Sequence, residues 1–359
     1  MNTYNIYNQI TIKVEGDGPA VNQLKSTLRA FENIEVQNPD LTISILSNYN
    51  PPVTAQILGS PEEYYSTNDG EFVFVKYGDP IMINNDFTRI RASSTAPPNF
   101  IRLIMEWRVR HELLNEGFSM IHASGVKYNE ESIAFPAWRH TGKTNTMLTF
   151  LERGAHFLAD DRLFIGSENM VRGYPTDLHI LSYNYDSFPE LTPRSPLSKI
   201  RGKVSNTLDR FTSQNSSIFS KGMNLANEVF VAEDDWFALE EVFPESSTIY
   251  ETDLNKIVLL RTTTSDEPYI LPIEGSELTD ALCAINYYEW DRTLLEIGLN
   301  IRALTGDTAF EKSVRDVLRK QQKVFKSISD SVPIQMLCVP REEHWKPKTK
   351  QKIFEYVTE

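Results

Sequence analysis

The chain has 359 residues, of which 40% are hydrophobic and 24% charged, so it can bury a large core and is not disordered overall. Its formal net charge of −13 gives it little electrostatic reason to bind a nucleic-acid backbone or an anionic membrane. The chain has no apolar run of transmembrane length, and its first residues lack the pattern of a signal peptide. Its two cysteines, Cys283 and Cys338, lie far apart in the sequence, and we expect the protein in the reducing cytoplasm.

The first third of the chain predicts a small α+β lobe, 1–98. Apolar and polar residues alternate with the period of a strand in several places, and a Gly-Pro pair precedes apolar residues at helical spacing. Strands are expected at 7–14, 41–46, 71–76 and 81–84, and a helix at 21–31. The last two strands flank a Gly-Asp-Pro turn and predict a hairpin.

The remainder predicts a second, larger domain, 99–345, followed by a charged tail, 346–359. Helices are expected at 99–116, 141–153 and 308–328, and strands at 120–127, 132–135, 157–159, 256–261 and 332–339. Segment 182–245 is rich in Ser, Pro and Asn and predicts a lid-like insertion. It contains a cluster of basic residues, namely Arg194, Lys199, Arg201 and Lys203. These side chains either belong to a solvated loop or fold over the phosphates of a ligand or substrate. The expected class is α/β, with a mixed sheet flanked by helices.

Segment 133–161 contains the residues most typical of a chemical function. A strand leads into a turn, then Gly142-Lys143-Thr144, a helix, and a second strand that ends in Asp160-Asp161. This is the context of a phosphate-binding loop, in which backbone N–H groups and a lysine bind the anion. A threonine hydroxyl and a carboxylate are hard oxygen ligands, which Mg²⁺ prefers. Ala137 replaces the first consensus glycine, which costs nothing if its φ is negative.

The predicted nucleotide site is the loop together with the first residues of the helix. Its members are Ala137, Trp138, Arg139, His140, Thr141, Gly142, Lys143, Thr144 and Asn145. Arg139 and His140 either face solvent or add positive charge near phosphate, and Trp138 either packs the loop tip or covers the nucleotide. His122, on the strand before the loop, is either a satisfied core histidine or a functional one.

Segment 120–161 resembles the catalytic core of HPr kinase/phosphorylase. The shared pieces are Ile121-His122-Ala123 on a strand, the AWRHTGKT loop, and Arg153-Gly154 followed by Leu158-Ala159-Asp160-Asp161. The resemblance implies a P-loop kinase core of the HPr kinase C-terminal type, with ATP and Mg²⁺ as cofactors. The chain lacks the glutamate-arginine-glycine signature of true HPr kinases. It therefore looks closer to the relatives that serve biosynthetic clusters, including kinases of peptide precursors.

The resemblance also implies a role for each matching residue. Lys143 and Thr144 would bind phosphate and magnesium, Asp160 would take the proton of the acceptor, and Asp161 would help to hold the metal. His122 would lie near the two aspartates and tune the base. The implied reaction moves the γ-phosphate of ATP to a hydroxyl group, namely that of a serine in a protein or peptide. No nucleic acid or membrane is expected as a partner, and the formation of a homo-oligomer stays an open possibility. Two alternatives are an NTP-binding or hydrolysing regulatory module without kinase activity, and a scaffold protein that retains a dead P-loop.

Overall fold

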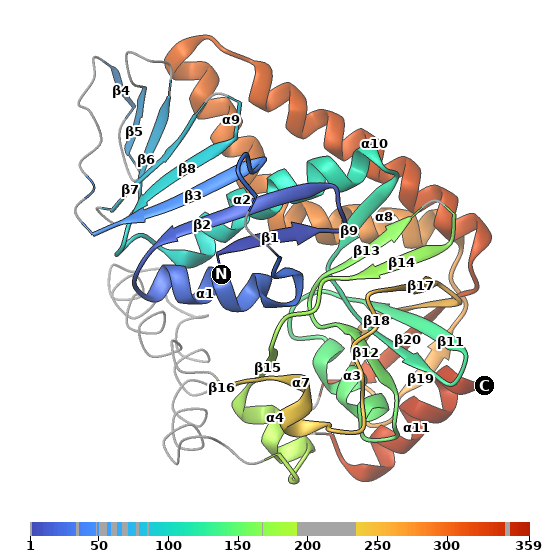
Figure 1. The fold of residues 1–359 in the computed structure, drawn as a ribbon. Coiled ribbons are helices and arrows are strands. Elements are labelled where there is room, and N and C mark those ends of the chain that lie inside the picture. Colours follow the sequence, from blue (N-terminus) through green and yellow to red (C-terminus); the bar gives the residue numbers. More distant parts are fainter. Residues whose placement is uncertain are drawn as a thin grey trace, which may run out of the picture. The chain divides into compact units, whose positions relative to one another are not determined.

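The structure is a computed structural model with two compact units. It describes residues 2–33, 36–47, 49, 56–58, 63–66, 71–76, 79–84, 86–166, 168–191, 235–341 and 345–359. Within these ranges the protein is mixed α/β, with several mixed sheets flanked by helices, as predicted at that level (Figure 1). Unit 1 comprises Met1–His122, Arg162–Thr176 and Glu274–Pro333, and unit 2 comprises Ala123–Asp161, Asp177–Ile273 and Ile334–Glu359. The units are assembled from interleaved segments, and the boundary proposed at residue 98 falls inside unit 1.

Unit 1 contains a mixed eight-stranded sheet in the order β1-β2-β3-β8-β7-β6-β5-β4. Its strands are β1 (Thr3–Ile6), β2 (Ile10–Gly16), β3 (Leu41–Leu46), β4 (Gln56–Leu58), β5 (Glu63–Ser66), β6 (Phe72–Lys76), β7 (Asp79–Ile83) and β8 (Arg89–Ser93). β2, β3 and β8 run parallel, whereas the other neighbours pair antiparallel. The strand predicted at 7–14 was wrong at its start, because a turn with positive φ at Tyr7 and Asn8 separates β1 from β2. The hairpin predicted around the Gly-Asp-Pro turn is confirmed as β6 and β7.

The rest of unit 1 adds helices and a small antiparallel group of strands. The helices are α1 (Pro19–Leu28), the 3₁₀ turn η1 (Arg29–Phe31), α2 (Pro98–Asn115), α8 (Gly275–Asn286), the π-helical η2 (Tyr287–Asp291), α9 (Arg292–Thr305) and α10 (Ala309–Ser331). The strands are β9 (Phe118–Ile121), β13 (Leu163–Gly166) and β14 (Met170–Gly173). Apolar residues on α10 recur at helical spacing and are buried, as the sequence predicts. Inside this core, Arg110 donates to Asp291 at 2.7 Å, and both side chains are buried.

Unit 2 contains a six-stranded sheet in the order β12-β10-β11-β18-β20-β19. Its strands are β10 (Ala123–Tyr128), β11 (Glu131–Pro136), β12 (His156–Ala159), β18 (Lys256–Thr263), β19 (Tyr269–Leu271) and β20 (Ile334–Pro340). β11, β18 and β20 run parallel, and the outer pairs are antiparallel. The remaining elements are α3 (Lys143–Leu151), β15 (Leu178–Ile180), α4 (Ser182–Ser187), β16 (Asp235–Phe237), α7 (Leu239–Val242), β17 (Glu251–Asp253) and α11 (Pro347–Thr358).

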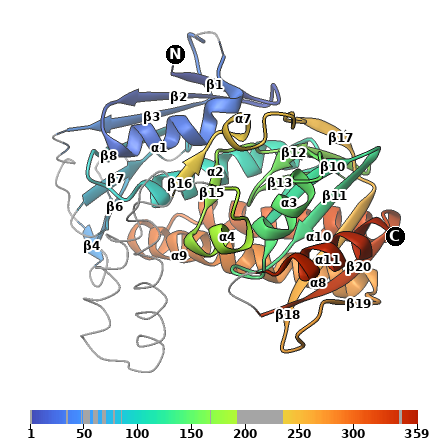
Figure 2. The ribbon, with the colours of Figure 1, turned by 90° about the horizontal axis from the view of Figure 1, so that it is seen from below.

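The predicted charged tail folds as α11, which lies beside α3 (Figure 2). Lys350 of α11 donates to both carboxylate oxygens of Glu152 at 3.1 Å, and Arg153 stacks over the ring of Phe354. These contacts fix the helix that follows the phosphate-binding motif. Among the described helices, none combines the length and the apolar character that a membrane span requires.

Candidate functional site

The loop between β11 and α3 has the strand–loop–helix order that the sequence predicts. β11 ends at Pro136, α3 begins at Lys143, and Gly142 precedes the helix with φ +97°. Glycine adopts this backbone conformation without the strain that a side chain would bring. Ala137 is buried, and it is not among the residues with positive φ. Alanine at this position therefore introduces no backbone strain.

The loop combines an exposed tip with a buried base. Trp138, Arg139 and His140 are exposed, whereas the side chains of Thr141 and Lys143 are buried. Gly142 has no side chain that could cap the first N–H groups of α3, so these groups and the positive end of the helix dipole are available to an anion. The carbonyl of Lys143 accepts a hydrogen bond from the buried Ser124 hydroxyl at 3.1 Å. The first turn of α3 is thus fixed to β10.

The side chain of Trp345 packs against the loop at Gly142. A β-carbon built at Gly142 would lie 2.6 Å from Cζ2 of Trp345 and 3.1 Å from its Cη2. Trp345 is buried, and its backbone N–H donates to the Ser187 hydroxyl at 2.8 Å. A side chain at position 142 would force the buried indole to shift, so this contact favours glycine in addition to the positive φ. This contact could not be predicted from the sequence, because Trp345 lies outside the motif.

Asp160 lies directly after β12 and is almost completely buried. The Thr144 hydroxyl donates to its carboxylate, with Oγ1 at 3.1 Å from Oδ2 and 3.2 Å from Oδ1. Burial, together with the neighbouring charge of Asp161, raises the pKa of Asp160 to about 6, although Lys143 and Thr144 oppose the shift. A carboxylate in such a site gains from any cation that binds beside it.

Asp161 has a different environment from its neighbour. Its backbone has φ 78°, and its side chain is 43% exposed. Its Oδ1 lies 3.4 Å from Nζ of Lys143. One aspartate therefore contacts the threonine from inside the protein, and the other contacts the lysine from the solvent side.

The residues fit the P-loop type of magnesium site. Thr144 and Asp160 bring a hydroxyl and a carboxylate together, and Mg²⁺ in such sites takes its other ligands from phosphates and water. The described residues contain no group of three or more His, Cys, Asp and Glu side chains that could hold a metal ion. The arrangement therefore suits an ion that arrives with a nucleotide, and not one held by an all-protein cage.

Two other predicted site residues make contacts within the protein core. Asn145 is buried, and its Oδ1 accepts a hydrogen bond from Asn184 at 2.7 Å, which connects α3 to α4. His122 is the last residue of the first segment of unit 1 and is also buried. Its Nε2 lies 4.0 Å from Oε1 of Glu289, and its ring meets Trp290 edge-on. The two aspartates belong to unit 2, so a role of His122 beside them stays a prediction.

His179 is a residue near the site that the sequence analysis missed. It lies on β15 and lowers the pKa of Asp160, as the smallest of the influences on that carboxyl. A single histidine in a three-residue strand carries no sequence signal. The basic cluster of the predicted insertion, residues 194–203, lies outside the described residues.

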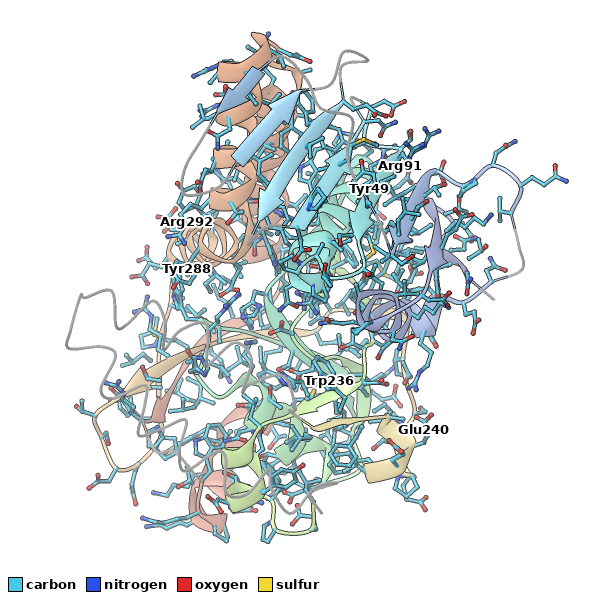
Figure 3. All side chains as sticks on the ribbon, turned by 90° about the vertical axis from the view of Figure 1, so that its left-hand side faces the viewer. Tyr49, Arg91, Trp236, Glu240, Tyr288 and Arg292 are labelled. Atoms are coloured by element: carbon cyan, nitrogen blue, oxygen red, sulfur yellow. The ribbon has the colours of Figure 1, made fainter. Side chains whose placement is uncertain are left out.

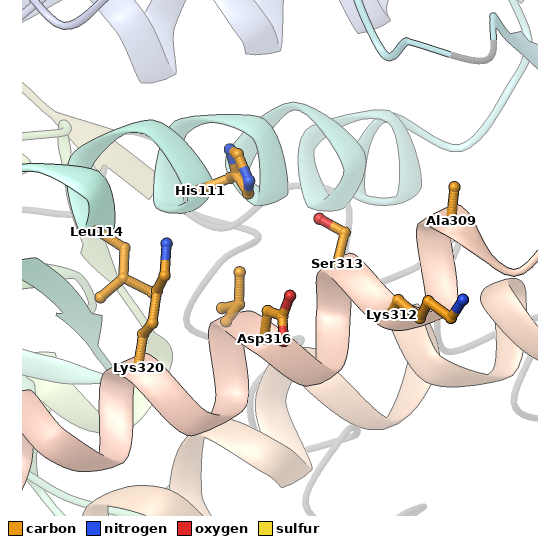
Figure 4. A pocket seen from close by; sticks show the side chains of 8 residues that line it. His111, Leu114, Ala309, Lys312, Ser313, Asp316 and Lys320 are labelled. Carbon is orange, nitrogen blue, oxygen red and sulfur yellow. The ribbon is translucent and has the colours of Figure 1, made fainter.

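Two cavities lie away from the loop. One, of about 330 Å³, is in unit 1 between α2 and α10 (Figure 4). It is lined by His111, Leu114, Ala309, Lys312, Ser313, Asp316, Val317 and Lys320. The other, of about 800 Å³, is in unit 2 around the C-terminal end of α3, with Glu152, Glu190 and Phe243 in its wall. Neither is lined by a predicted site residue.

Comparisons with known proteins identify no family. No protein-family model matches the chain, and no curated protein matches its sequence. The likeness to HPr kinase/phosphorylase is therefore an inference from the residues of segment 120–161.

Proposed function

We propose that this protein is an ATP- and Mg²⁺-dependent kinase of the HPr kinase-like type, which moves the γ-phosphate to a serine hydroxyl of a protein or peptide. One observation supports this above the others. At the N-terminus of α3, Thr144 contacts one aspartate and Lys143 contacts the next. A phosphate-binding helix start, a mobile cation and two unlike carboxylates are the parts that phosphoryl transfer needs.

Different residues would bind the phosphates of ATP and the magnesium ion. The N–H groups of α3 and the Lys143 ammonium would bind the β- and γ-phosphates, where the lysine would exchange its contact with Asp161 for phosphate oxygens. Thr144 and Asp160 would hold Mg²⁺, which supplies charge neutralisation to the phosphates when it is bound. In this class of reaction most of the catalysis comes from positioning and electrostatic stabilisation.

The geometry favours the reverse of the aspartate roles expected from the sequence. Asp160 is buried and already contacts the threonine, so a magnesium ion at that hydroxyl would lie beside Asp160. Asp161 is the carboxylate that solvent, and so an acceptor, can reach, and it lies next to the lysine that would hold the γ-phosphate. We therefore assign Asp161 as the base that takes the acceptor's proton and Asp160 as the metal-side ligand.

The experiment measures ATP consumption and phosphate transfer with serine-containing peptides, together with the magnesium dependence of ATP binding. Asp161→Asn should keep Mg²⁺·ATP affinity and slow transfer by about 10²–10⁴-fold, as expected for loss of a general base. Asp160→Asn should raise the magnesium concentration that is needed. Asp253→Asn, an exposed aspartate on β17, is the matched control and should change neither property.

Each outcome has a separate meaning. The reversed pattern for the two variants would restore the assignment of Asp160 as the base. ATP consumption without any acceptor would show a hydrolase, and absence of both nucleotide binding and turnover would show a scaffold. Full transfer by a folded Lys143→Ala variant would refute the P-loop assignment itself.

A further inference from the structure

The C-terminal helix α11, together with the tryptophan that precedes it, contacts both ends of α3. At the start of α3 the Trp345 indole lies against Gly142, where its Cζ2 would be 2.6 Å from a β-carbon. At the other end, Nζ of Lys350 lies 3.1 Å from both carboxylate oxygens of Glu152. Segment 345–358 therefore holds the helix that follows the phosphate-binding loop at both of its ends.

Aromatic packing adds to the contact at the far end of α3. The rings of Phe150 and Phe354 have centroids 5.1 Å apart, and the Arg153 guanidinium lies 4.8 Å from the centroid of the Phe354 ring. Lys350 also lies over the ring of Phe188, at 4.1 Å from its centroid. Phe150 and Phe188 belong to the buried core of unit 2. The helix α11 is thus packed onto that core.

The position of Trp345 is fixed by its neighbours. The residue is 3% exposed and belongs to the core of unit 2. Its backbone N–H donates to the Ser187 hydroxyl at 2.8 Å, at the end of α4. Only Lys346 separates it from Pro347, the first residue of α11. The place of the indole therefore depends on the docking of α11.

Gly142 is the residue on which this contact acts. Glycine adopts positive and negative φ about equally well, so it loses more conformational freedom than any other residue when it becomes ordered. The carbonyl of Gly142 accepts hydrogen bonds from the N–H and the hydroxyl of Thr146, both at 2.9 Å. The Trp345 indole packs where a β-carbon would stand. Together these contacts hold Gly142 at φ +97° before an anion binds, which lowers the cost of binding.

We propose that segment 345–358 is a C-terminal clamp, which holds the phosphate-binding loop in its anion-binding conformation with Trp345 as the positioning residue. This inference rests on the proposed function and adds a form of regulation to the same site, because release of α11 would lower nucleotide affinity. By linkage, a nucleotide bound at the loop stabilises the docked helix by the same factor.

The test removes the contacting atoms and keeps an aromatic ring in the core. The atoms nearest to a β-carbon at Gly142 are Cζ2 and Cη2, at the outer edge of the Trp345 indole, and the single ring of phenylalanine is shorter. Trp345→Phe should therefore weaken binding of mant-ATP with Mg²⁺ about tenfold, which corresponds to the cost of ordering one backbone residue. Fluorescence titration of the full chain measures this change.

Two other tryptophans provide matched controls. Trp107 is also 3% exposed, but it belongs to unit 1. Trp236 belongs to unit 2, where its exposed indole on β16 stacks on His179 (Figure 3). Trp107→Phe and Trp236→Phe should both bind mant-ATP as the wild type does. Urea unfolding of all three variants distinguishes a general loss of stability from a loss of affinity.

A double-mutant cycle tests whether the indole acts through Gly142. Gly142→Ala places a β-carbon against the Trp345 indole, so it should reduce mant-ATP affinity more in the wild type than in Trp345→Phe. Equal reductions in the two backgrounds would overturn the inference. Unchanged affinity of Trp345→Phe would overturn it as well.

Hydrogen exchange separates this inference from the proposed function. Without nucleotide, backbone amides of residues 142–147 should exchange about tenfold faster in Trp345→Phe than in the wild type, and at the wild-type rate in Trp107→Phe. With Mg²⁺ and a non-hydrolysable ATP analogue, amides of α11 should exchange more slowly in the wild type. Unchanged exchange in α11 at a saturating concentration of the analogue would overturn the regulation.

The two failures give different results. Faster loop exchange in Trp345→Phe, combined with a wild type that binds no nucleotide, would support the clamp and refute the kinase. Nucleotide binding by the wild type, combined with equal loop exchange in the wild type and Trp345→Phe, would refute the clamp and leave the kinase in place.

Discussion

Asp160→Asn should make the nucleotide-free protein more stable at neutral pH while it damages magnesium-dependent ATP binding. Asp160 is buried, so its negative charge is held in a poor environment until a cation binds. Asparagine has nearly the shape of the protonated acid and can still accept the Thr144 hydrogen bond through its oxygen. The substitution therefore removes a charge with little change of packing.

The magnitude follows from the pKa. Burial and Asp161 raise the pKa of Asp160 from 3.8 to about 6, which corresponds to about 3 kcal/mol at 1.36 kcal/mol for each tenfold change in proton affinity. Because the pKa is higher in the folded protein, its contribution to stability is fully present below about pH 4. This contribution, about 3 kcal/mol in total, is lost as the pH rises through about 6. Above that pH the folded state is less stable by this amount than it would be with a protonated group.

The assay is urea unfolding of the wild type and the variant between pH 4 and pH 7.5, without nucleotide. The difference in unfolding free energy, variant minus wild type, should rise across this range and level off above about pH 7. Taking the difference cancels the other titrating groups that the two proteins share. Adding Mg²⁺·ATP at pH 7.5 should stabilise the wild type much more than the variant, because ligand binding to the native state adds to its stability.

A difference that is independent of pH would refute the reasoning, because it would mean that Asp160 has the same pKa in the folded and unfolded states. A variant that loses stability relative to the wild type as the pH rises would also refute it. The second result would show that the carboxylate is stabilised in its charged form without a metal ion.

Gly142→Ala should reduce both stability and nucleotide affinity, because the β-carbon of alanine would meet the indole of Trp345 at 2.6 Å and alanine is strained at φ +97°. Urea unfolding measures the loss of stability, and nucleotide titration measures the loss of affinity. Asp291→Ala should cost about 3–5 kcal/mol of stability, since it leaves the buried Arg110 guanidinium without its carboxylate. Burial raises the pKa of Glu152 to about 7, so its contribution to stability is present below about pH 4.5 and lost as the pH rises through 7. Glu152→Gln should therefore gain stability relative to the wild type between pH 5 and pH 8, measured by urea unfolding, and a pH-independent difference would contradict this.

The sequence was informative wherever structure depends on neighbours along the chain. The strand–loop–helix around Gly142-Lys143-Thr144 follows from local rules for turns, helix starts and apolar periodicity, and the structure has it. The hairpin around the Gly-Asp-Pro turn was predictable for the same reason. The split between β1 and β2 was missed because Tyr7 and Asn8 adopt positive φ. Asparagine tolerates this conformation, and no glycine at the turn indicated it in the sequence.

The phosphate-binding motif and the pair of carboxylates could be predicted from the sequence, because each is encoded within a few consecutive residues. The strand predicted at 120–127 was wrong, because the chain leaves one sheet after β9 and enters another at β10, with His122 between them. The difference between the two carboxylates comes from tertiary packing. It buried Asp160 against Thr144 and left Asp161 open beside Lys143, although the two are adjacent in the chain. It also brought Trp345 to Gly142. Burial and contacts between distant segments determine the pKa of each group and its exposure to solvent. The pKa and the exposure cannot be predicted from residue order, because they depend on how the rest of the chain packs around each group.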